Sequence, residues 1–407
     1  MVRVAFIAGT YRPQRCGVAD YTAHLRAELS AQGVESCVLT TDVAAVAVDE
    51  AAVRGVVPNW RLADMIPLVC AVKSTAADIL HIQHAAGTYG FQRPVFLLPL
   101  LLRLVGDRKP IVTTVHEYGW WEWEPPGIPP QWLEGVKQWG QQRGWWERED
   151  GFLLTGSQAI ITTNADAQRV ILERLPHKSE HVYRIPIAAS VGTAANPTVE
   201  YREQYGWQAA TVIAFFGFLH PVKGIENLLS ALQPIARQHP QVRLLLVGGV
   251  ESLALPAQAA QEYWEKLHAL IDTLHLKDVV EMTGYVEAEV ASHYLARADI
   301  GVLPFNHGVT LKSSSLLTLM AHGLPIVATR HEPPDLDLDH QVCLVPPRNV
   351  AALREALLKL ISDREQRDRL AQQGREFVRR FTWSDIAHKH LRIYKQLMMK
   401  EDSLQKT

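Results

Sequence analysis

Cysteine and long apolar runs are both scarce in this sequence. The four cysteines, Cys16, Cys37, Cys70 and Cys343, form no C-x-x-C pair, so we interpret them as reduced thiols and not as a disulfide framework or a zinc site. No run approaches the roughly 20 apolar residues that cross a bilayer, and "MVRVAFIAG" has the pattern of a strand and not of a signal peptide. We therefore expect a cytoplasmic protein without a transmembrane segment.

An excess of charge of one sign is also missing. The 41 lysines and arginines nearly balance the 43 aspartates and glutamates, which gives a net charge of −2. This balance excludes the broad basic field of nucleic-acid-binding proteins, while peripheral contact with a membrane and the oligomeric state stay open. With 47% hydrophobic residues, a chain of 407 residues is long enough for two globular domains.

Short apolar runs alternate with amphipathic helical segments in both halves of the chain. Runs such as "RVAFIAG", "IVTTVHE", "TVIAFFG" and "VRLLLVGG" predict parallel strands with helices on both faces. The segment "AASVGTAANPT" lacks periodicity and is interpreted as a linker. The sequence therefore predicts an α/β fold with two doubly wound Rossmann-like domains, residues 1–187 and 188–380, and a C-terminal helix, residues 381–407, that we expect to pack back on the first domain.

Carboxylates are absent from residues 308–325, "GVTLKSSSLLTLMAHGLP". A helix that starts near Lys312 to Ser315 and stops at Gly323 would gather three hydroxyls, free backbone N–H groups and one cation directly after a strand. Helix N-termini attract anions, and an acid in the first turn would repel a phosphate, so this absence favours an anion site. The alternative is an ordinary serine cap on a core helix.

Two other strand–loop–helix turns are candidates for phosphate binding. In "FFGFLHPVKGIENLL", Lys223 lies at the mouth of the turn, where α/β folds bind their ligands. In "GTYRPQRCGVADYT", Gly17 would let a helix N-terminus approach a diphosphate. The alternatives are a solvated surface lysine at position 223 and a tight turn that merely needs glycine at position 17.

Histidines at strand ends are further candidates. His116 and Glu117 follow the strand "IVTTV", where a histidine can bond a substrate hydroxyl or move a proton, although a lone histidine is more often structural. His81 and His84 do not point down one face of a strand, so we propose no metal site there.

Seven of the eleven tryptophans lie between Trp120 and Trp146. Flat indoles can stack on sugars or sit at a membrane interface, but for most of these tryptophans we prefer packing of an irregular insertion against the first domain. Trp120 and Trp121, nearest to His116, are the better candidates for substrate contact. The interleaved acids argue against an anionic membrane surface; they are Glu122, Glu124, Glu134 and Glu147.

In their order and spacing, these motifs resemble the retaining glycosyltransferases of family 4, which have the GT-B fold. "CGVADYTAHLRAEL" resembles their N-terminal glycine loop, "FFGFLHPVKGIENLLSAL" their phosphate clamp, "VVEMTGYV" part of their base-binding region, and "LMAHGLPIVAT" the end of their donor-site helix. The resemblance covers nearly the whole chain. It implies two Rossmann-like domains that face across a cleft, a nucleoside-diphosphate-sugar substrate of the UDP or GDP type, no cofactor and no metal.

The resemblance also implies roles for individual residues. His116 and Lys223 are the expected catalytic residues. The expected donor-binding residues are Gly17, Phe218, Lys223, Gly284, Tyr285, Thr310, Leu311, Lys312, Ser313, Ser314 and Thr318. The acceptor-side candidates are Cys16, Glu117, Trp120 and Trp121.

Two departures from the family pattern affect the recognition of ribose and sugar. The family usually has an arginine where this chain has Phe218, and two glutamates where it has Thr310 and Thr318. A neutral hydroxyl contributes less to binding than a charge-assisted hydrogen bond. We expect Lys312 to supply the charge that Phe218 lacks.

The sequence as a whole predicts retaining transfer of a sugar from a nucleoside-diphosphate donor to a hydroxyl acceptor. No pair of carboxylates indicates a glycosyl-enzyme intermediate, which favours a front-face route. One alternative is a non-catalytic GT-B subunit that binds a nucleotide within a glycosyltransferase complex. A less favoured alternative is a nucleotide-sugar epimerase.

Overall fold

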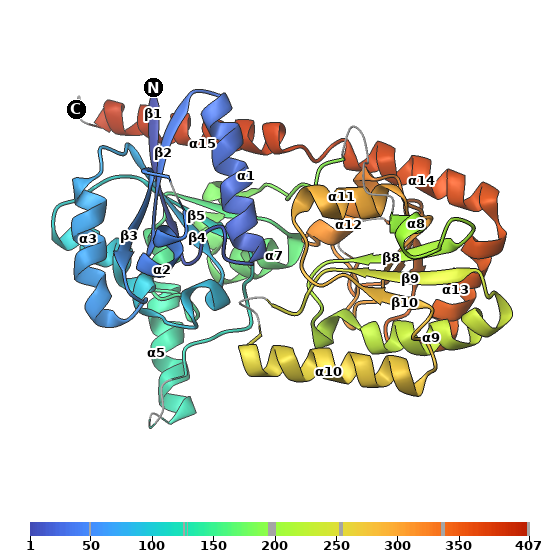
Figure 1. Ribbon diagram of the computed structural model, residues 1–407. Helices are drawn as coiled ribbons and strands as arrows, with labels where there is room; N and C mark the ends of the chain where they lie inside the picture. Colours follow the sequence, from blue (N-terminus) through green and yellow to red (C-terminus); the bar gives the residue numbers. More distant parts are fainter. Residues whose placement is uncertain are drawn as a thin grey trace. The chain divides into compact units, whose positions relative to one another are not determined.

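The computed structural model describes residues 1–48, 50–124, 127, 129–193, 201–251, 255–334 and 338–404 (Figure 1). The chain divides into two compact units. Unit 1 comprises Met1–Pro186 and Trp383–Thr407, and unit 2 comprises Ile187–Thr382. Part of the predicted linker, residues 194–197, lies outside the described residues. The C-terminal helix therefore belongs to the same unit as the N-terminus.

Unit 1 is built on a seven-stranded parallel sheet with the order β3-β2-β1-β4-β5-β6-β7. Every residue of β4 and β5 is buried, as expected for central strands that helices cover on both faces. The strands are β1 (Val2–Ala8), β2 (Val34–Thr41), β3 (Val53–Val57), β4 (Ile79–His84), β5 (Ile111–Val115), β6 (Ala159–Thr162) and β7 (Val182–Arg184).

The helices of unit 1 include α15, which runs alongside α1 (Figure 1). In this contact, the Trp383 ring stacks on His24 with centroids 4.9 Å apart and meets the edge of Tyr21 at 5.3 Å. The α-helices are α1 (Gly17–Ala31), α2 (Asp42–Val46), α3 (Met65–Ser74), α4 (Leu98–Leu104), α5 (Pro130–Gln142), α6 (Leu153–Gly156), α7 (Ala165–Arg174) and α15 (Trp383–Leu404); the 3-10 turns are η1 (Leu62–Asp64), η2 (Ala86–Tyr89), η3 (Pro94–Leu97) and η4 (Pro176–His181).

Unit 2 repeats this architecture with a six-stranded parallel sheet in the order β10-β9-β8-β11-β12-β13. Its strands are β8 (Thr211–Phe216), β9 (Val242–Val247), β10 (Val280–Met282), β11 (Ile300–Leu303), β12 (Ile326–Thr329) and β13 (Cys343–Val345). Its helical elements are α8 (Tyr201–Gln204), η5 (Pro221–Lys223), α9 (Ile225–Gln238), α10 (Ala257–Thr273), α11 (Ala288–Ala296), α12 (Ser314–Ala321), α13 (Val350–Ser362) and α14 (Arg364–Val378). The prediction of two doubly wound domains with a helical C-terminal segment is confirmed.

Because the strands of unit 2 are parallel, the loops that follow β8 and β11 leave the sheet at the same edge. The apolar face of α9 fixes the first of these loops, since Ile225, Leu228 and Leu229 are fully buried. The second loop leads into α12, whose residues Ser315–Met320 are all buried. Among the described helices, none is both long and apolar enough to cross a bilayer.

Candidate functional site

The end of β8 and the start of α12 meet at this edge of unit 2. Gly217 follows β8 with a φ of +131°, and a Cβ at this position would lie 2.7 Å from Ser315 Oγ. A side chain at this position would therefore require at least the Ser315 hydroxyl to move. The close approach brings the hydroxyl-bearing helix start beside the loop that leads to Lys223.

Lys223 is held at the ends of β8 and β11. It closes the turn η5, and the next residue, Gly224, has a left-handed backbone that comes so near Pro304 that a Cβ would lie 2.1 Å from its carbonyl oxygen. Lys223 Nζ lies 3.8 Å from the centroid of the Phe305 ring. Burial and the positive charge of Lys223 together lower the pKa of His220, three residues earlier. The lysine thus occupies the strand-end position at which α/β sheets bind ligands.

A pair of asparagines positions this loop, and the sequence analysis missed both. Asn306 donates Nδ2–H to the Pro221 carbonyl at 2.9 Å, and its Oδ1 accepts from Asn227 Nδ2 at 3.0 Å. These bonds connect η5, α9 and the segment after β11. The three groups are up to 85 residues apart in sequence, so no local pattern indicated that they would meet.

The start of α12 is capped as the sequence predicted. Ser313 is the N-cap, its Oγ accepts from Leu316 N at 3.3 Å, and the first turn carries no acid. Lys312 is exposed, whereas Leu311 is buried. Of the predicted donor-binding residues here, Lys312 can therefore offer its side chain to a ligand, while Leu311 can offer only backbone groups.

The two threonines that replace the family's glutamates are both buried. Thr310 Oγ1 has no hydrogen-bond partner within the described part of the chain. Thr318 is fully buried, and its Oγ1 lies 3.5 Å from Ser190 Oγ. Ser190 comes from the segment that the sequence analysis interpreted as a linker, so its place beside Thr318 was not predicted. Thr318 can reach a ribose only through a rearrangement of its surroundings, whereas Ser190 is partly exposed.

Glycines join the predicted base-binding segment to the end of β9. Gly248 and Gly284 form an antiparallel bridge, and Thr283 Oγ1 accepts from Gly248 N at 3.2 Å. Tyr285, 38% exposed, follows this bridge. A Cβ at Gly249 would lie 2.2 Å from Glu251 Oε2, so this carboxylate, which the sequence analysis did not select, also lies at the segment.

In unit 1, His116 follows β5 and is held as a neutral imidazole. Its Nε2 lies 3.0 Å from Gln83 Oε1, and its ring meets the edge of Tyr21 with centroids 4.7 Å apart. With Gln83 Oε1 as the acceptor, Nε2 carries the proton and Nδ1 is left as an acceptor. Burial, with smaller contributions from His84 and His390, lowers the pKa of His116 to about 3. The side chain can orient a hydroxyl, but it is not cationic near neutral pH.

Other histidines near His116 are buried. His81 Nδ1 lies 2.6 Å from Tyr394 Oη of α15, and its Nε2 lies 2.7 Å from Thr114 Oγ1. Burial lowers the pKa of His84 to about 4 and that of His390 to about 4. No three His, Cys, Asp or Glu side chains converge as a possible metal site among the described residues.

The start of α1 leaves space where a ligand could approach. Gly17 is the first residue of the helix, its φ is not positive, and a Cβ there would have nothing within 4 Å. Within the described residues, therefore, neither a left-handed backbone nor close packing requires a glycine at this position. Cys16 is the N-cap without a side-chain cap bond, and burial raises the pKa of its thiol.

The acceptor-side candidates differ in exposure. Glu117 is exposed, and so is Trp120, at 56%. Trp121 instead packs on the core of unit 1, with the Arg93 guanidinium 3.9 Å from its ring centroid. Arg93 also donates to the Trp121 carbonyl at 2.9 Å. Trp121 therefore has a packing contact within unit 1, and its predicted contact with substrate stays a prediction.

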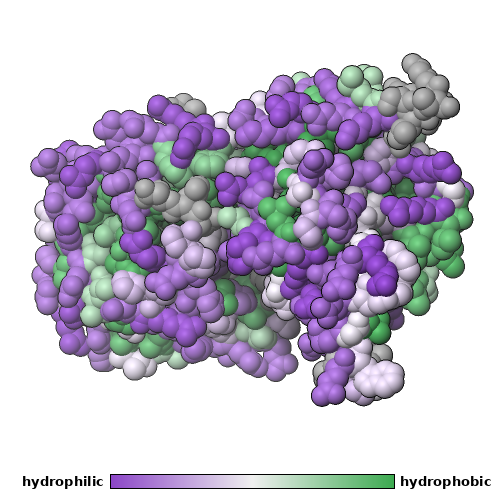
Figure 2. Space-filling view, turned by 180° about the vertical axis from the view of Figure 1, so that it is seen from behind, coloured by the Kyte–Doolittle hydropathy of each residue, from purple (hydrophilic) through white to green (hydrophobic). Residues whose placement is uncertain are grey.

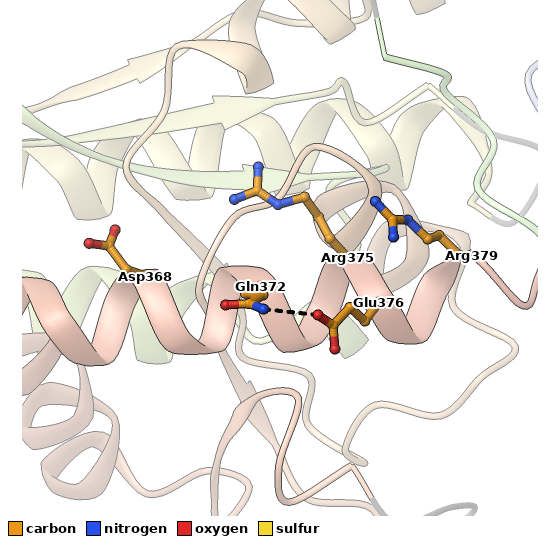
Figure 3. A pocket seen from close by; sticks show the side chains of 5 residues that line it. All are labelled: Asp368, Gln372, Arg375, Glu376 and Arg379. Carbon is orange, nitrogen blue, oxygen red and sulfur yellow. Dashed lines mark hydrogen bonds between the residues drawn. The ribbon is translucent and has the colours of Figure 1, made fainter.

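A pocket of about 430 Å³ lies along α14 in unit 2 (Figure 3). Its lining side chains come from this helix and its C-cap and carry charges of both signs. They are Asp368, Gln372, Arg375, Glu376 and Arg379. A Cβ at Gly323 would lie 2.3 Å from Arg375 Nη1, so this arginine packs at the C-terminal end of α12. The pocket contains none of the predicted site residues.

Comparison with protein families assigns both halves of the chain. A model described as "Glycosyltransferase Family 4" matches residues 16–189, and one described as "Glycosyl transferases group 1" matches residues 198–377. Together the two models span most of both units. The chain belongs to the glycosyltransferases of family 4, which have the GT-B fold.

Curated relatives match over part of their length. A phosphatidyl-myo-inositol mannosyltransferase from Mycobacterium leprae is 30% identical over 191 residues, which cover 45% of this chain and 46% of that protein. A D-inositol 3-phosphate glycosyltransferase from Corynebacterium urealyticum is 28% identical over 252 residues, which cover 59% of this chain and 51% of that protein. The chain thus spans about half the length of these relatives.

Solved structures show the same fold over the whole chain. A sucrose-phosphate synthase from Thermosynechococcus elongatus has a TM-score of 0.71 at 20% identity and covers 98% of this chain and 100% of its own. Anabaena HepE, solved with UDP and glucose, has a TM-score of 0.69 at 17% identity and covers 97% and 100%. At sequence identities this low, the similarity shows the fold and not the activity.

Proposed function

We propose that this protein is a cytoplasmic retaining glycosyltransferase that moves a sugar from a nucleoside-diphosphate donor to a hydroxyl acceptor without a metal. The observation that carries the proposal is the approach of β8 to the acid-free start of α12, where Gly217 lies against Ser315, together with Lys223 at the adjoining strand end. Helix N–H groups and an ammonium group are suited to a diphosphate.

In this proposal, unit 2 stabilises the leaving group. Negative charge grows on the diphosphate as the bond between the sugar and the phosphate oxygen breaks. Lys223, Lys312 and the backbone N–H groups of α12 would stabilise that charge, which is the role that a cation has in other folds. A diphosphate oxygen takes the proton of the acceptor hydroxyl, and that hydroxyl attacks the anomeric carbon from the same face.

The neutral state of His116 fits a positioning role in substrate binding. With a pKa of about 3, this imidazole cannot serve as a cationic general acid near pH 7. It can still hydrogen-bond a sugar or acceptor hydroxyl. His116→Ala should lower turnover by far more than it weakens binding of the free nucleotide, and equal losses in both would contradict this role.

Nucleotide binding gives the first test. UDP, GDP and ADP would be titrated by calorimetry, without metal, into the wild type, Lys223→Ala and the matched control Lys277→Ala, whose lysine is a 70% exposed surface side chain of unit 2. One nucleotide should bind, with a roughly 10- to 100-fold weaker Kd in Lys223→Ala and no change in Lys277→Ala. Binding that both variants retain in full would contradict the role of Lys223.

A second candidate function is a non-catalytic nucleotide-binding subunit. The burial of Thr318 and the presence of Phe218 favour it, because two polar contacts to the donor are missing. The two functions differ in donor turnover. Nucleotide sugars that contain the base identified by calorimetry would be screened as donors. A transferase should release nucleoside diphosphate in the presence of an acceptor. Its product should have the donor's anomeric configuration by NMR. Nucleotide binding without release of diphosphate from any donor would support the subunit.

A further inference from the structure

Helix α5 of unit 1 presents apolar side chains outward. Trp132, Val136 and Trp139 follow one another at i, i+4 and i+7, and they are 77%, 52% and 44% exposed. Trp145, 54% exposed, meets Trp139 edge-on with ring centroids 4.9 Å apart. We call these four residues the indole stripe. We expected most of the tryptophans in this segment to pack against the first domain, but five of the seven are exposed; they are Trp120, Trp123, Trp132, Trp139 and Trp145.

The inner face of the same helix carries a lysine that forms ion pairs. Leu133 and Lys137 are buried, and Lys137 Nζ lies 3.3 Å from both Glu122 Oε2 and Glu134 Oε1. Gly140 fits against the Trp146 ring so closely that a Cβ would lie 1.9 Å from it. A surface helix normally turns its apolar stripe inward and its charges outward. Helix α5 departs from this pattern, because Lys137 is buried and Trp132 and Trp139 are exposed, although Leu133 also faces inward.

Most acids of this segment are paired with basic side chains, which weakens the sequence argument against contact with an anionic membrane surface. Arg148 Nη2 pairs with Glu134 at 2.9 Å. Arg174 pairs with Glu122 at 3.0 Å and with Glu147 at 3.4 Å. The fourth acid, Glu124, is exposed. Three of the four interleaved glutamates thus face basic partners within unit 1.

One cation adjoins the indole stripe. The Arg143 guanidinium lies 4.5 Å from the Trp139 ring centroid and donates to the Trp139 carbonyl at 3.2 Å. Arg143 is exposed. An indole with a guanidinium beside it matches the zone where lipid phosphates and carbonyls meet the acyl chains, because the rings are amphipathic and the cation complements a phosphate.

The shape of unit 1 makes the stripe accessible. Figure 1 shows α5 extending away from the sheet of its own unit. Figure 2 shows the same projection from behind, with near-white residues, intermediate in hydropathy, at its tip. A projecting helix can enter an interface without burying the rest of the unit.

The area of the stripe distinguishes between possible partners. Its exposed surface is roughly 400–500 Å², if a fully exposed indole side chain contributes about 250 Å². A stable protein interface needs about 800 Å² from each partner, whereas an interfacial helix is anchored by a few aromatic residues. We propose that the indole stripe is a membrane-contact surface that seats α5 at the headgroup boundary of a zwitterionic bilayer, with the indoles among the upper acyl chains and Arg143 beside the phosphates.

This surface does not depend on the nucleotide chemistry of unit 2, so the two proposals can fail separately. The test is flotation of the full-length protein, without nucleotide, with vesicles of phosphatidylcholine and with vesicles that contain 30% phosphatidylglycerol. The variants are Trp132→Ala/Trp139→Ala and, as a matched control, Leu62→Ala/Ile66→Ala. The control removes side chains that are 64% and 73% exposed at η1 and the start of α3 in the same unit.

We expect the wild type to float with phosphatidylcholine vesicles, and 0.5 M salt to change the partition coefficient less than twofold because indoles dominate the contact. The tryptophan variant should partition roughly tenfold or more weakly, from the apolar area that it removes, while the control is unchanged. Circular dichroism would verify that both variants fold. The proposal would be overturned if the wild type did not float, or if the tryptophan variant floated equally well. It would also be overturned if the wild type bound no vesicles but formed a dimer in sedimentation that the tryptophan variant abolished.

Discussion

Helices α12 and α5 orient their apolar residues in opposite ways. In α12, the apolar residues Leu316, Leu317 and Met320 are fully buried, and the functional groups gather at its N-terminus. In α5, the tryptophans face outward, and the lysine lies inside. The direction in which the apolar side chains point therefore distinguishes the proposed anion site from the proposed contact surface.

The reason for the difference is the partner that each helix packs against. Helix α12 lies against the strand ends of its own sheet, as the contact between Gly217 and Ser315 shows. Helix α5 packs on a group of ion pairs, so its buried face needs a cation, Lys137. Its apolar residues then occupy the remaining, outward face.

Acid pH should have the largest effect on stability. It should destabilise unit 1, which contains α5, first. Burial lowers the pKa of His116 to about 3 and holds those of His84 and His390 at about 4. These groups are neutral when folded and gain protons on unfolding below about pH 6.5. Their contribution to the free energy of unfolding is therefore present above pH 6.5 and is lost as the pH falls toward 4. The loss is on the order of 1 kcal/mol per pH unit for each histidine. Urea unfolding at pH 7, 6 and 5, followed by the tryptophan fluorescence of unit 1, would measure this, and a constant midpoint would contradict it.

Truncation in α12 should have the next largest effect. Leu316→Ala removes a fully buried side chain and should cost about 2–5 kcal/mol of unfolding free energy. The matched change on α5, Trp132→Ala, should stay within about 0.5 kcal/mol because the ring is exposed. Thermal unfolding of both variants would measure the contrast. A large loss in Trp132→Ala would show that the stripe packs within the protein.

Removal of the inward lysine of α5 should have a smaller effect. Lys137→Ala should cost about 1–2 kcal/mol, since Glu122 keeps its pairs with Arg148 and Arg174. Lys137→Met retains the buried stem and removes the charge. If the ion pair matters, both variants lose stability by urea unfolding. If packing alone matters, Lys137→Met will match the wild type.

Removal of the N-cap of α12 should have a smaller effect on stability than removal of the inward lysine. Ser313→Ala removes the bond from Leu316 N to Oγ and should cost about 1 kcal/mol. Ser313→Asp is the informative companion, because it keeps a cap but adds a negative charge where we place a phosphate. It should fold like the wild type by thermal unfolding and yet bind nucleoside diphosphate more weakly than Ser313→Ala. Tighter binding by Ser313→Asp would argue against a phosphate at this helix start.

Much of unit 2 was predictable because its signals are local. Hydrophobic period and glycine stops predicted β8, α9 and α12, and the absence of acids indicated the capped helix start. Ser190, Asn227 and Asn306 were missed because their contacts join segments that are far apart in sequence. The exposure of the tryptophans was missed for a different reason. The buried face of α5 includes a charged residue, Lys137, whereas a pattern rule assumes that this face is apolar.

The central claim is that a nucleoside diphosphate binds between the loop after β8 and the start of α12. Hydrogen–deuterium exchange with and without the nucleotide identified by calorimetry tests this most directly, since bound phosphates protect the N–H groups that they accept from. The account predicts protection confined chiefly to peptides covering residues 217–224 and 310–316, with α5 unchanged. Protection centred on α14, at the pocket of Figure 3, with none at α12, would contradict it.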